Sequence, residues 1–288
     1  KRNYFLAIAV AGLMLASEVA WAADISFSGQ FRPRYNMNED TTDTTNASHN
    51  FTTRVRLNAN ANVNANTSVF MQFQSVGTWG GAATATTGSR DSTVPSDVEN
   101  SVGLHQAYVT LKSFFGQPVN AKIGRQEVVL DGHRLFGHTG WTDGAQTNDA
   151  IRLDHSGGNH TLNYIYIAQT EAEAENTNTT ANAHYHVFRA ATQGVLGGDL
   201  SGYFVVTDDE AINAVDFGAD ENTFYTIGAR QKGKLGGLDY RVEYYHQFGD
   251  GGVEANAANF TAAYSGPLTD VDRNANMFGA RIGKTFKN

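Results

Sequence analysis

The sequence has no cysteine and only four prolines among its 288 residues. Without cysteine, the protein has neither a disulfide framework nor a thiolate metal site. Beyond residue 22 there is no run of about 20 consecutive apolar residues, which excludes a membrane-spanning helix in that part of the chain. Long apolar patterns with the helical period are almost absent too, so an ordinary soluble domain rich in helices is not expected.

The N-terminal segment has the three parts of a secretory signal peptide. Lys1 and Arg2 are positively charged, residues 5–16 (FLAIAVAGLMLA) are apolar, and residues 20–22 (AWA) form a cleavage site. We therefore expect residues 1–22 to be removed, near Ala22, and residues 23–288 to form a single domain. The apolar part is too short to cross a membrane. The remaining destinations are the periplasm, the outer membrane and the exterior.

The rest of the chain repeats one pattern, in which about ten residues of alternating apolar and polar character precede a turn or a loop. Successive side chains of a strand point to opposite faces, so each such segment has one apolar and one polar face. The pattern predicts strands at residues 24–37, 50–63, 67–79, 101–112, 119–130, 148–155, 160–169, 184–194, 199–207, 222–232, 237–248 and 274–286.

The connections between the predicted strands alternate in length. Tight turns lie near Asn64, Gly116, Gly157, Gly197 and Gly236. Outer-membrane barrels have long outer loops and short periplasmic turns. We therefore predict an all-β fold, an antiparallel transmembrane β-barrel of the porin type in the outer membrane of a Gram-negative bacterium. The long loops are expected at residues 38–49, 80–100, 131–147, 170–183, 208–221 and 249–273.

A soluble β-sandwich or β-solenoid would also show alternating strands. Aromatic residues at the ends of the apolar faces argue against these folds, because membrane barrels carry aromatic girdles at both interfaces. The residues with this placement are Tyr35, Trp79, Phe115, Phe248 and Phe286.

The net charge is −8, but acidic and basic residues occupy different parts of the chain. Acidic residues gather in the predicted loops, as in residues 171–175 (EAEAE), whereas most arginines lie in strands and oppose the apolar face. An arginine facing lipid at mid-depth costs about 2–4 kcal/mol, so these arginines are expected to face the lumen. A pore wall rich in arginine favours anions. The predicted pore-lining residues are Arg32, Arg34, Arg54, Arg56, Arg125, Arg152, Arg189, Arg230, Arg241 and Arg281.

A second interpretation of these arginines stays open. They could pair with acidic residues in the lumen and only stiffen the barrel, with Asp154, Asp239 and Glu243 as available partners.

Residues 124–153 (GRQEVVLDGHRLFGHTGWTDGAQTNDAIRL) form the most specific motif of the chain. This segment resembles the hallmark segment of the alginate-export family of outer-membrane porins. Residues 146–149 (QTND) depart from the Arg-x-Phe-Asp of that family by lacking one basic and one aromatic residue. The matching residues are Gly124, Arg125, Gln126, Glu127, Arg134, Leu135, Gly137, Trp141, Asp149, Arg152 and Leu153.

The resemblance implies passive passage of an anionic polysaccharide, an alginate-like polyuronate, across the outer membrane. A general anion-selective porin for small solutes is the alternative. The family has large barrels of about 16–18 strands. We therefore expect the chain to be a truncated form of a longer barrel, while a smaller complete barrel stays open. Outer-membrane lipid is the expected surrounding, and a periplasmic export partner is left open.

The resemblance also suggests a path for the motif. Arg125 would approach the lumen, Trp141 would lie in a loop at the outer mouth, and Arg152 would return along the next strand. Simple alternation places Arg125 beside Ile123 on the apolar face. We therefore predict a bulge near Gly124 that turns Arg125 to the polar face.

Residue patterns for other chemistry are weak. His155 and Ser156 would be the site of a barrel lipid hydrolase, the alternative from another class, but they fall at a predicted turn where Ser-Gly-Gly is ordinary. His184 and His186 share one strand face without an evident third metal ligand. The sequence contains no phosphate loop, dinucleotide fingerprint or basic nucleic-acid patch. We expect no enzyme activity, no cofactor, no metal and no nucleic-acid partner.

Overall fold

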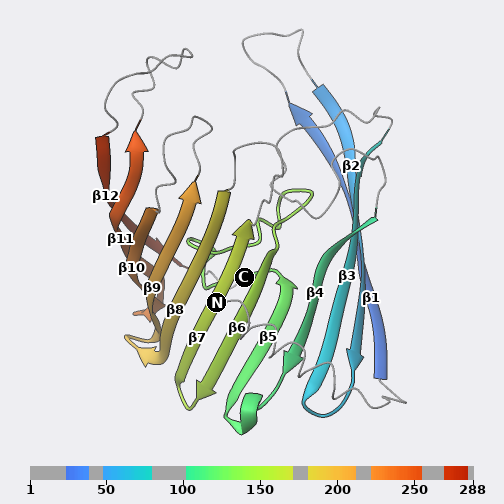
Figure 1. The fold of residues 1–288 in the computed structure, drawn as a ribbon, viewed down its shortest axis with the longest axis horizontal. Helices are drawn as coiled ribbons and strands as arrows, with labels where there is room; N and C mark the ends of the chain where they lie inside the picture. The colour runs from blue at the N-terminus through green and yellow to red at the C-terminus, as the bar shows by residue number, and fades with distance from the viewer. Residues whose placement is uncertain are drawn as a thin grey trace. The chain divides into compact units, whose positions relative to one another are not determined.

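The computed structural model describes residues 24–38, 48–79, 102–170, 181–211, 222–254 and 269–284. Within these residues lie twelve β-strands and one short 3₁₀ helix, which confirms the predicted all-β fold (Figure 1). The strands follow one another in chain order in an antiparallel sheet. The predicted signal peptide and most residues of the long loops, except the loop at 131–147, lie outside the described residues.

No helix in the described part of the chain has the length and apolarity that a membrane crossing requires.

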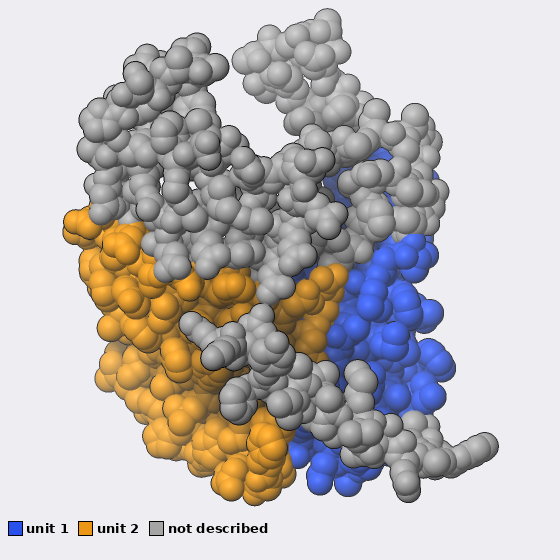
Figure 2. Space-filling view, viewed as in Figure 1, with its two compact units in different colours: residues 1–112, 126–147 blue, residues 113–125, 148–288 orange. Residues whose placement is uncertain are grey.

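The chain divides into two compact units (Figure 2). The first comprises residues 1–112 and 126–147, and the second comprises residues 113–125 and 148–288. The strands of the first unit are β1 (Asp24–Asn38), β2 (Ser48–Asn62), β3 (Thr67–Thr78) and β4 (Val102–Leu111).

The second unit begins with the 3₁₀ helix η1 (Phe114–Gly116) and with β5 (Val119–Gln126), whose last residue belongs to the first unit. Its other strands are β6 (Asn148–Gly157), β7 (His160–Thr170), β8 (Ala181–Val195), β9 (Gly198–Ala211), β10 (Asn222–Leu235), β11 (Leu238–Glu254) and β12 (Thr269–Gly283).

The strand boundaries differ from the predicted ones most at β5, β9, β11 and β12. β9 extends to residue 211 rather than 207, and β12 begins at residue 269 rather than 274. β5 ends at Gln126 rather than at residue 130, so that residues 127–147 form one long connection to β6. β11 extends to residue 254, beyond its predicted end at 248. The turn between β10 and β11 consists of Gly236 and Gly237 with φ of 59° and 79°. Two successive positive φ angles define the tight hairpin turn that glycine allows.

The two faces of β1 and β2 differ as the alternation predicts. In β1, Phe31 and Tyr35 are exposed, whereas Arg32 and Arg34 between them are partly buried. Such apolar faces left bare by the protein are typical of strands that face lipid. Further exposed members of these faces are Phe27, Phe51, Val55 and Leu57 in the first unit, and Phe188, Phe204, Ile227, Val242, Tyr244, Phe278 and Ile282 in the second.

Aromatic rings on the apolar faces contact one another from strand to strand. In the first unit, Phe51 lies 4.8 Å from Tyr35 and 5.6 Å from Trp79 between ring centroids. These bands resemble the aromatic girdles of membrane barrels. Over both units they include three of the predicted girdle residues, Tyr35, Trp79 and Phe248. In the second unit, centroid distances of 5.0–6.2 Å connect Tyr164, Phe188, Phe204, Tyr225 and Phe248 in succession.

A glycine on the polar face of the second unit makes room for a tyrosine ring. Gly228 of β10 is the register partner of Tyr245 in β11, and a Cβ atom at Gly228 would lie 2.1 Å from that ring. Tyr203 of β9 is the other partner of Gly228, and its ring centroid lies 5.8 Å from that of Tyr245. Both tyrosines are buried, so the ring contact across the glycine packs three strands together.

Candidate functional site

A β-bulge in β4 brings two neighbouring residues to the polar face. Gln72 of β3 pairs with Gln106, but the next residue, Phe73, pairs with Leu104, so His105 is the extra residue of the bulge. Bulges of this kind re-aim side chains. His105 and Gln106 are both buried, whereas Leu104 is exposed. Strict alternation would have placed His105 on the apolar face, so sequence reasoning missed it.

The connection from β5 to β6 packs against the polar face of the first unit through arginine hydrogen bonds. Arg32 donates to the carbonyl oxygens of Gly140 and Thr142, at 2.8 Å each, and its Nη2 lies 3.0 Å from Oδ1 of Asp143. Arg54 donates to the same two carbonyl oxygens at 3.4 and 3.2 Å. These two predicted pore-lining arginines therefore hold one segment, residues 140–143.

Arg34 holds the same segment in a different way. Its guanidinium carbon lies 4.5 Å from the ring centroid of Trp141, which is a cation–π distance. The guanidinium also donates to the carbonyl oxygen of Trp141 and pairs with Asp143, with 3.2 Å between Nη1 and Oδ1. Trp141 is thus fixed by Arg34 at both its backbone and one face of its ring.

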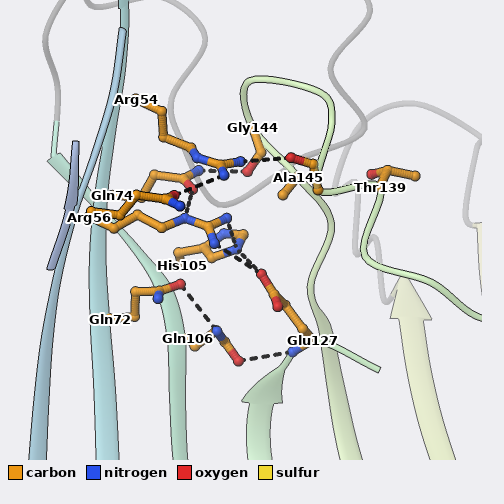
Figure 3. A network of polar contacts seen from close by, with 12 residues as sticks. Arg54, Arg56, Gln72, Gln74, His105, Gln106, Glu127, Thr139, Gly144 and Ala145 are labelled. Atoms are coloured by element: carbon orange, nitrogen blue, oxygen red, sulfur yellow. Dashed lines mark hydrogen bonds and ion pairs between the residues drawn. The ribbon is translucent and has the colours of Figure 1, made fainter. Parts of the chain in front are cut away.

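Arg56 anchors the start of the connection through a second network (Figure 3). Its Nε donates to Gln74 Oε1 at 2.6 Å, and its Nη1 lies 3.3 Å from Glu127 Oε1. Nε2 of His105 lies 2.9 Å from Arg56 Nη2 and 3.2 Å from Glu127 Oε1. In the tautomer without a hydrogen on Nε2 this nitrogen accepts from the guanidinium, and in the other tautomer it donates to the carboxylate. Gln74 also donates to the carbonyl oxygen of Gly144, at 2.7 Å.

A row of amides continues the network along the polar face. Gln72 donates to Asn58 Oδ1 at 2.7 Å, and Gln106 donates to Gln72 Oε1 at 3.1 Å. The backbone N–H of Glu127 in turn donates to Gln106 Oε1 at 3.1 Å. Below this row, Phe70 stacks on Tyr108 with 5.0 Å between ring centroids. Buried polar networks are stable when their members are hydrogen-bonded, and these bonds connect three strands to the segment after β5.

Glu127, the first residue after β5, is the acidic residue of this network. Burial raises the pKa of the Glu127 carboxyl, but the hydrogen bond with His105 and the charge of Arg56 lower it by more. The pKa therefore lies below its ordinary value of 4.5, and the carboxyl stays ionised beside the guanidinium at neutral pH.

The polar face of the second unit carries a further polar cluster. Arg152 pairs with Asp154 of its own strand, with 2.8 Å between Nε and Oδ1, and Asp154 accepts a hydrogen bond from Asn163. Arg189 donates to Asn163 Oδ1 at 2.9 Å and to Ser201 Oγ at 3.1 Å. The predicted residues Arg152 and Arg189 therefore lie in one cluster that extends from β6 to β9.

Basic residues of β10, β11 and β12 lie side by side near the turns. Arg241 is the register partner of Lys232 on one side and of Arg281 on the other. Like charges directly opposite on neighbouring strands are unfavourable for stability alone. Glu243 lies two residues after Arg241 in β11. Its carboxylate oxygens lie 3.8 Å from Nε of Arg230 and 3.8 Å from Nη2 of Arg241. Arg241 and Arg281 thus face each other in a basic row.

The structure does not place Arg125 on the polar face. Arg125 makes two hydrogen bonds to Asp149, at 2.9 and 2.7 Å, and Asp149 alternates in β6 with Ala150 on the side of Ile151. Gly124 does have an unusual φ of 123°, but the opposite charge of Asp149 holds Arg125 on the apolar side at the end of the strands. Of the other motif residues, Gln126 is buried and Arg134 is exposed.

The histidines outside the bulge have ordinary hydrogen-bond partners. Nδ1 of His155 lies 2.7 Å from the carbonyl oxygen of Pro118, which connects β6 to the residue that precedes β5 in the second unit. Nδ1 of His186 lies 2.9 Å from the hydroxyl of Tyr164, and Nδ1 of His184 lies 3.0 Å from that of Tyr166. Among the described residues, no group of three potential ligands could hold a metal ion.

A sheet with one bare apolar face, aromatic bands and an arginine-rich opposite face is consistent with an outer-membrane β-barrel. The sequence profile of the family described as "Alginate export" matches residues 23–288. The chain therefore belongs to the alginate export family, a family of transport channels and not of enzymes, which confirms the resemblance seen in residues 124–153. No curated protein matches the sequence.

Proposed function

We propose that the protein is an outer-membrane channel for the passive passage of an anionic polysaccharide, an alginate-like polyuronate. In this proposal the polar strand faces line the lumen, and their basic side chains attract the carboxylates of the polymer. The observation that carries the proposal is the excess of positive charge on the polar face of each unit.

In the first unit, the excess surrounds the segment bound after β5. Four guanidinium groups meet two carboxylates, those of Asp143 and Glu127, which leaves this cluster with a net charge of +2. The other acceptors are mostly carbonyl and amide oxygens. These groups are neutral, so they orient the guanidinium groups without cancelling their charge. In a low-dielectric wall, such charge raises the local concentration of anions.

In the second unit, the excess lies across β9 to β12. The basic residues Arg230, Lys232, Lys234, Arg241 and Arg281 share the polar face with the acidic residues Asp199, Asp239 and Glu243, again a net charge of +2. Arg189 adds a guanidinium group that donates to the neutral acceptors Asn163 and Ser201. Basic groups thus occur over the polar faces of both units rather than in one cluster, which favours passage of a polymer.

The test is the reversal potential of the full-length mature protein in a planar bilayer under a salt gradient, followed by titration with an oligouronate. We expect anion selectivity and a current that the oligouronate blocks. Cation selectivity would contradict the proposal. Anion selectivity without any effect of the sugar would leave the general anion porin as the function.

A pair of variants separates the polar face from arginine content in general. Arg241→Gln together with Arg281→Gln should move the reversal potential towards that of an unselective pore. The matched control is Arg125→Gln, because Arg125 is paired with Asp149 on the apolar side and should leave selectivity unchanged. Equal shifts in both proteins would show that the polar-face arginines have no special role.

A further inference from the structure

Trp141 is a large aromatic residue that is exposed on the polar side of the first unit. Its relative exposure is 80%. The exposed aromatic residues of β1 and β2 lie on the apolar face, where lipid is the expected surrounding. Trp141 instead lies in the segment held by Arg32, Arg34 and Arg54, whose side chains project from the opposite face.

The ring of Trp141 is held in place although it is exposed. The Arg34 guanidinium covers one ring face at 4.5 Å and donates to the carbonyl oxygen of the same residue. The neighbouring carbonyl oxygens of Gly140 and Thr142 are bonded to Arg32, at 2.8 Å each. Since one face of the ring is covered and the residue is largely exposed, the other face is open. A rigid aromatic group with an open face loses little conformational entropy when it binds a ligand.

An open indole face suits a ring with flat C–H surfaces, and the neighbouring charges suit an acidic one. Arg32 and Arg34 share the single carboxylate of Asp143, at 3.0 and 3.2 Å. The local charge is therefore positive and does not repel a uronate carboxylate. Ligand sites typically combine an aromatic contact surface with a few placed polar groups in this way.

We propose that Trp141 is a stacking platform for a pyranose ring of the transported polysaccharide, with Arg34 behind the ring and the Arg32–Arg34–Asp143 cluster beside it. This inference rests on the proposed channel function and adds the recognition of sugar rings to the attraction of charge.

The first experiment measures block of the bilayer current by an oligouronate in Trp141→Ala and Trp141→Phe proteins. Loss of an aromatic contact of this kind should raise the half-blocking concentration about three- to tenfold in Trp141→Ala, and less in Trp141→Phe. Trp79→Phe is the matched control, because Trp79 is an exposed tryptophan of the aromatic band on the apolar face. Oligouronate should block the current through Trp79→Phe at the same concentration as in the wild type.

A polyanion without sugar rings separates stacking from loop order. Block by oligoglutamate of similar charge should be the same in the wild type and in Trp141→Ala. If Trp141→Ala weakens block by oligouronate and block by oligoglutamate equally, Trp141 only maintains the conformation of the segment, and the inference is overturned. If the wild type is blocked by oligouronate and Trp141→Ala is unchanged, the inference fails while the channel proposal stands. A wild type that oligouronate does not block contradicts the proposed polysaccharide function itself.

Fluorescence gives a second readout that does not depend on current. In Trp79→Phe, Trp141 is the only tryptophan within residues 23–288. Oligouronate should quench or shift its emission in a saturable way, and oligoglutamate should not. No change at concentrations that block the current would overturn the inference.

Discussion

The buried ion pair of Arg56 and Glu127 makes a sharp stability prediction. The side chains are 10% and 20% exposed, and Nη1 lies 3.3 Å from Oε1. Glu127→Ala would leave the guanidinium largely buried without its carboxylate. Removing one partner of a fully buried pair costs about 3–5 kcal/mol. Because Glu127 retains some contact with solvent, we expect about 2–3 kcal/mol. Glu127→Gln keeps an acceptor for Arg56 and should cost less than Glu127→Ala.

The assay is urea unfolding of the protein refolded into lipid vesicles, followed by tryptophan fluorescence. The control is Asp149→Ala, which removes the carboxylate of the exposed Arg125–Asp149 pair, where the side chains are 33% and 54% exposed. Exposed pairs contribute about 0–1 kcal/mol, so this variant should unfold almost like the wild type. Equal losses in the two Ala variants would refute the argument from burial.

Three further predictions concern pH, packing and the two sheet faces. Because the pKa of Glu127 is depressed in the folded protein, the ionised carboxyl stabilises the fold above pH 4.5, and this contribution is lost as pH falls through the folded pKa. The unfolding free energies of the wild type and Glu127→Gln should therefore converge at low pH. Gly228→Ala should lower the free energy of unfolding in urea by about 1–3 kcal/mol, because its Cβ would overlap the ring of Tyr245. Gly202→Ala has open space at its Cβ and should leave the free energy of unfolding unchanged. Phe278→Arg should cost about 2–4 kcal/mol in vesicles if it lies near mid-depth, and Met277→Arg on the opposite face much less.

The strands could be predicted because their signal is local. Each depends on a period of two within about ten residues and on turn residues at its ends. All twelve expected strands occur, and β3 differs by a single residue. Residues 127–130 (EVVL) were expected to extend β5 because they are apolar enough for a strand. They leave the strand instead, and Glu127 turns to Arg56 at a position 71 residues away in sequence.

The site was less predictable because its partners are distant or carry no sequence signature. Every residue has a backbone carbonyl oxygen, so the sequence of residues 140–143 does not indicate that their carbonyl oxygens accept hydrogen bonds from Arg32 and Arg54. The bulge at His105 has no clear sequence signature, and the extra residue places His105 on the polar face beside Gln106. Arg125 was placed by alternation on the apolar side, and the expected correction by a bulge was the wrong step, because Asp149 supplies a partner there.

The two interpretations of the arginines, lining an anion path and stiffening the protein, do not exclude each other. Hydrogen bonds to carbonyl oxygens fix the guanidinium groups of Arg32 and Arg54 but leave their charge in place. An arginine held in this way costs little reorganisation when an anion approaches, because its orientation is already set. A lysine could supply the charge but lacks the planar fork that holds several oxygens at once. The same side chains can therefore order the segment that carries Trp141 and supply the positive field that a polyuronate would meet beside it.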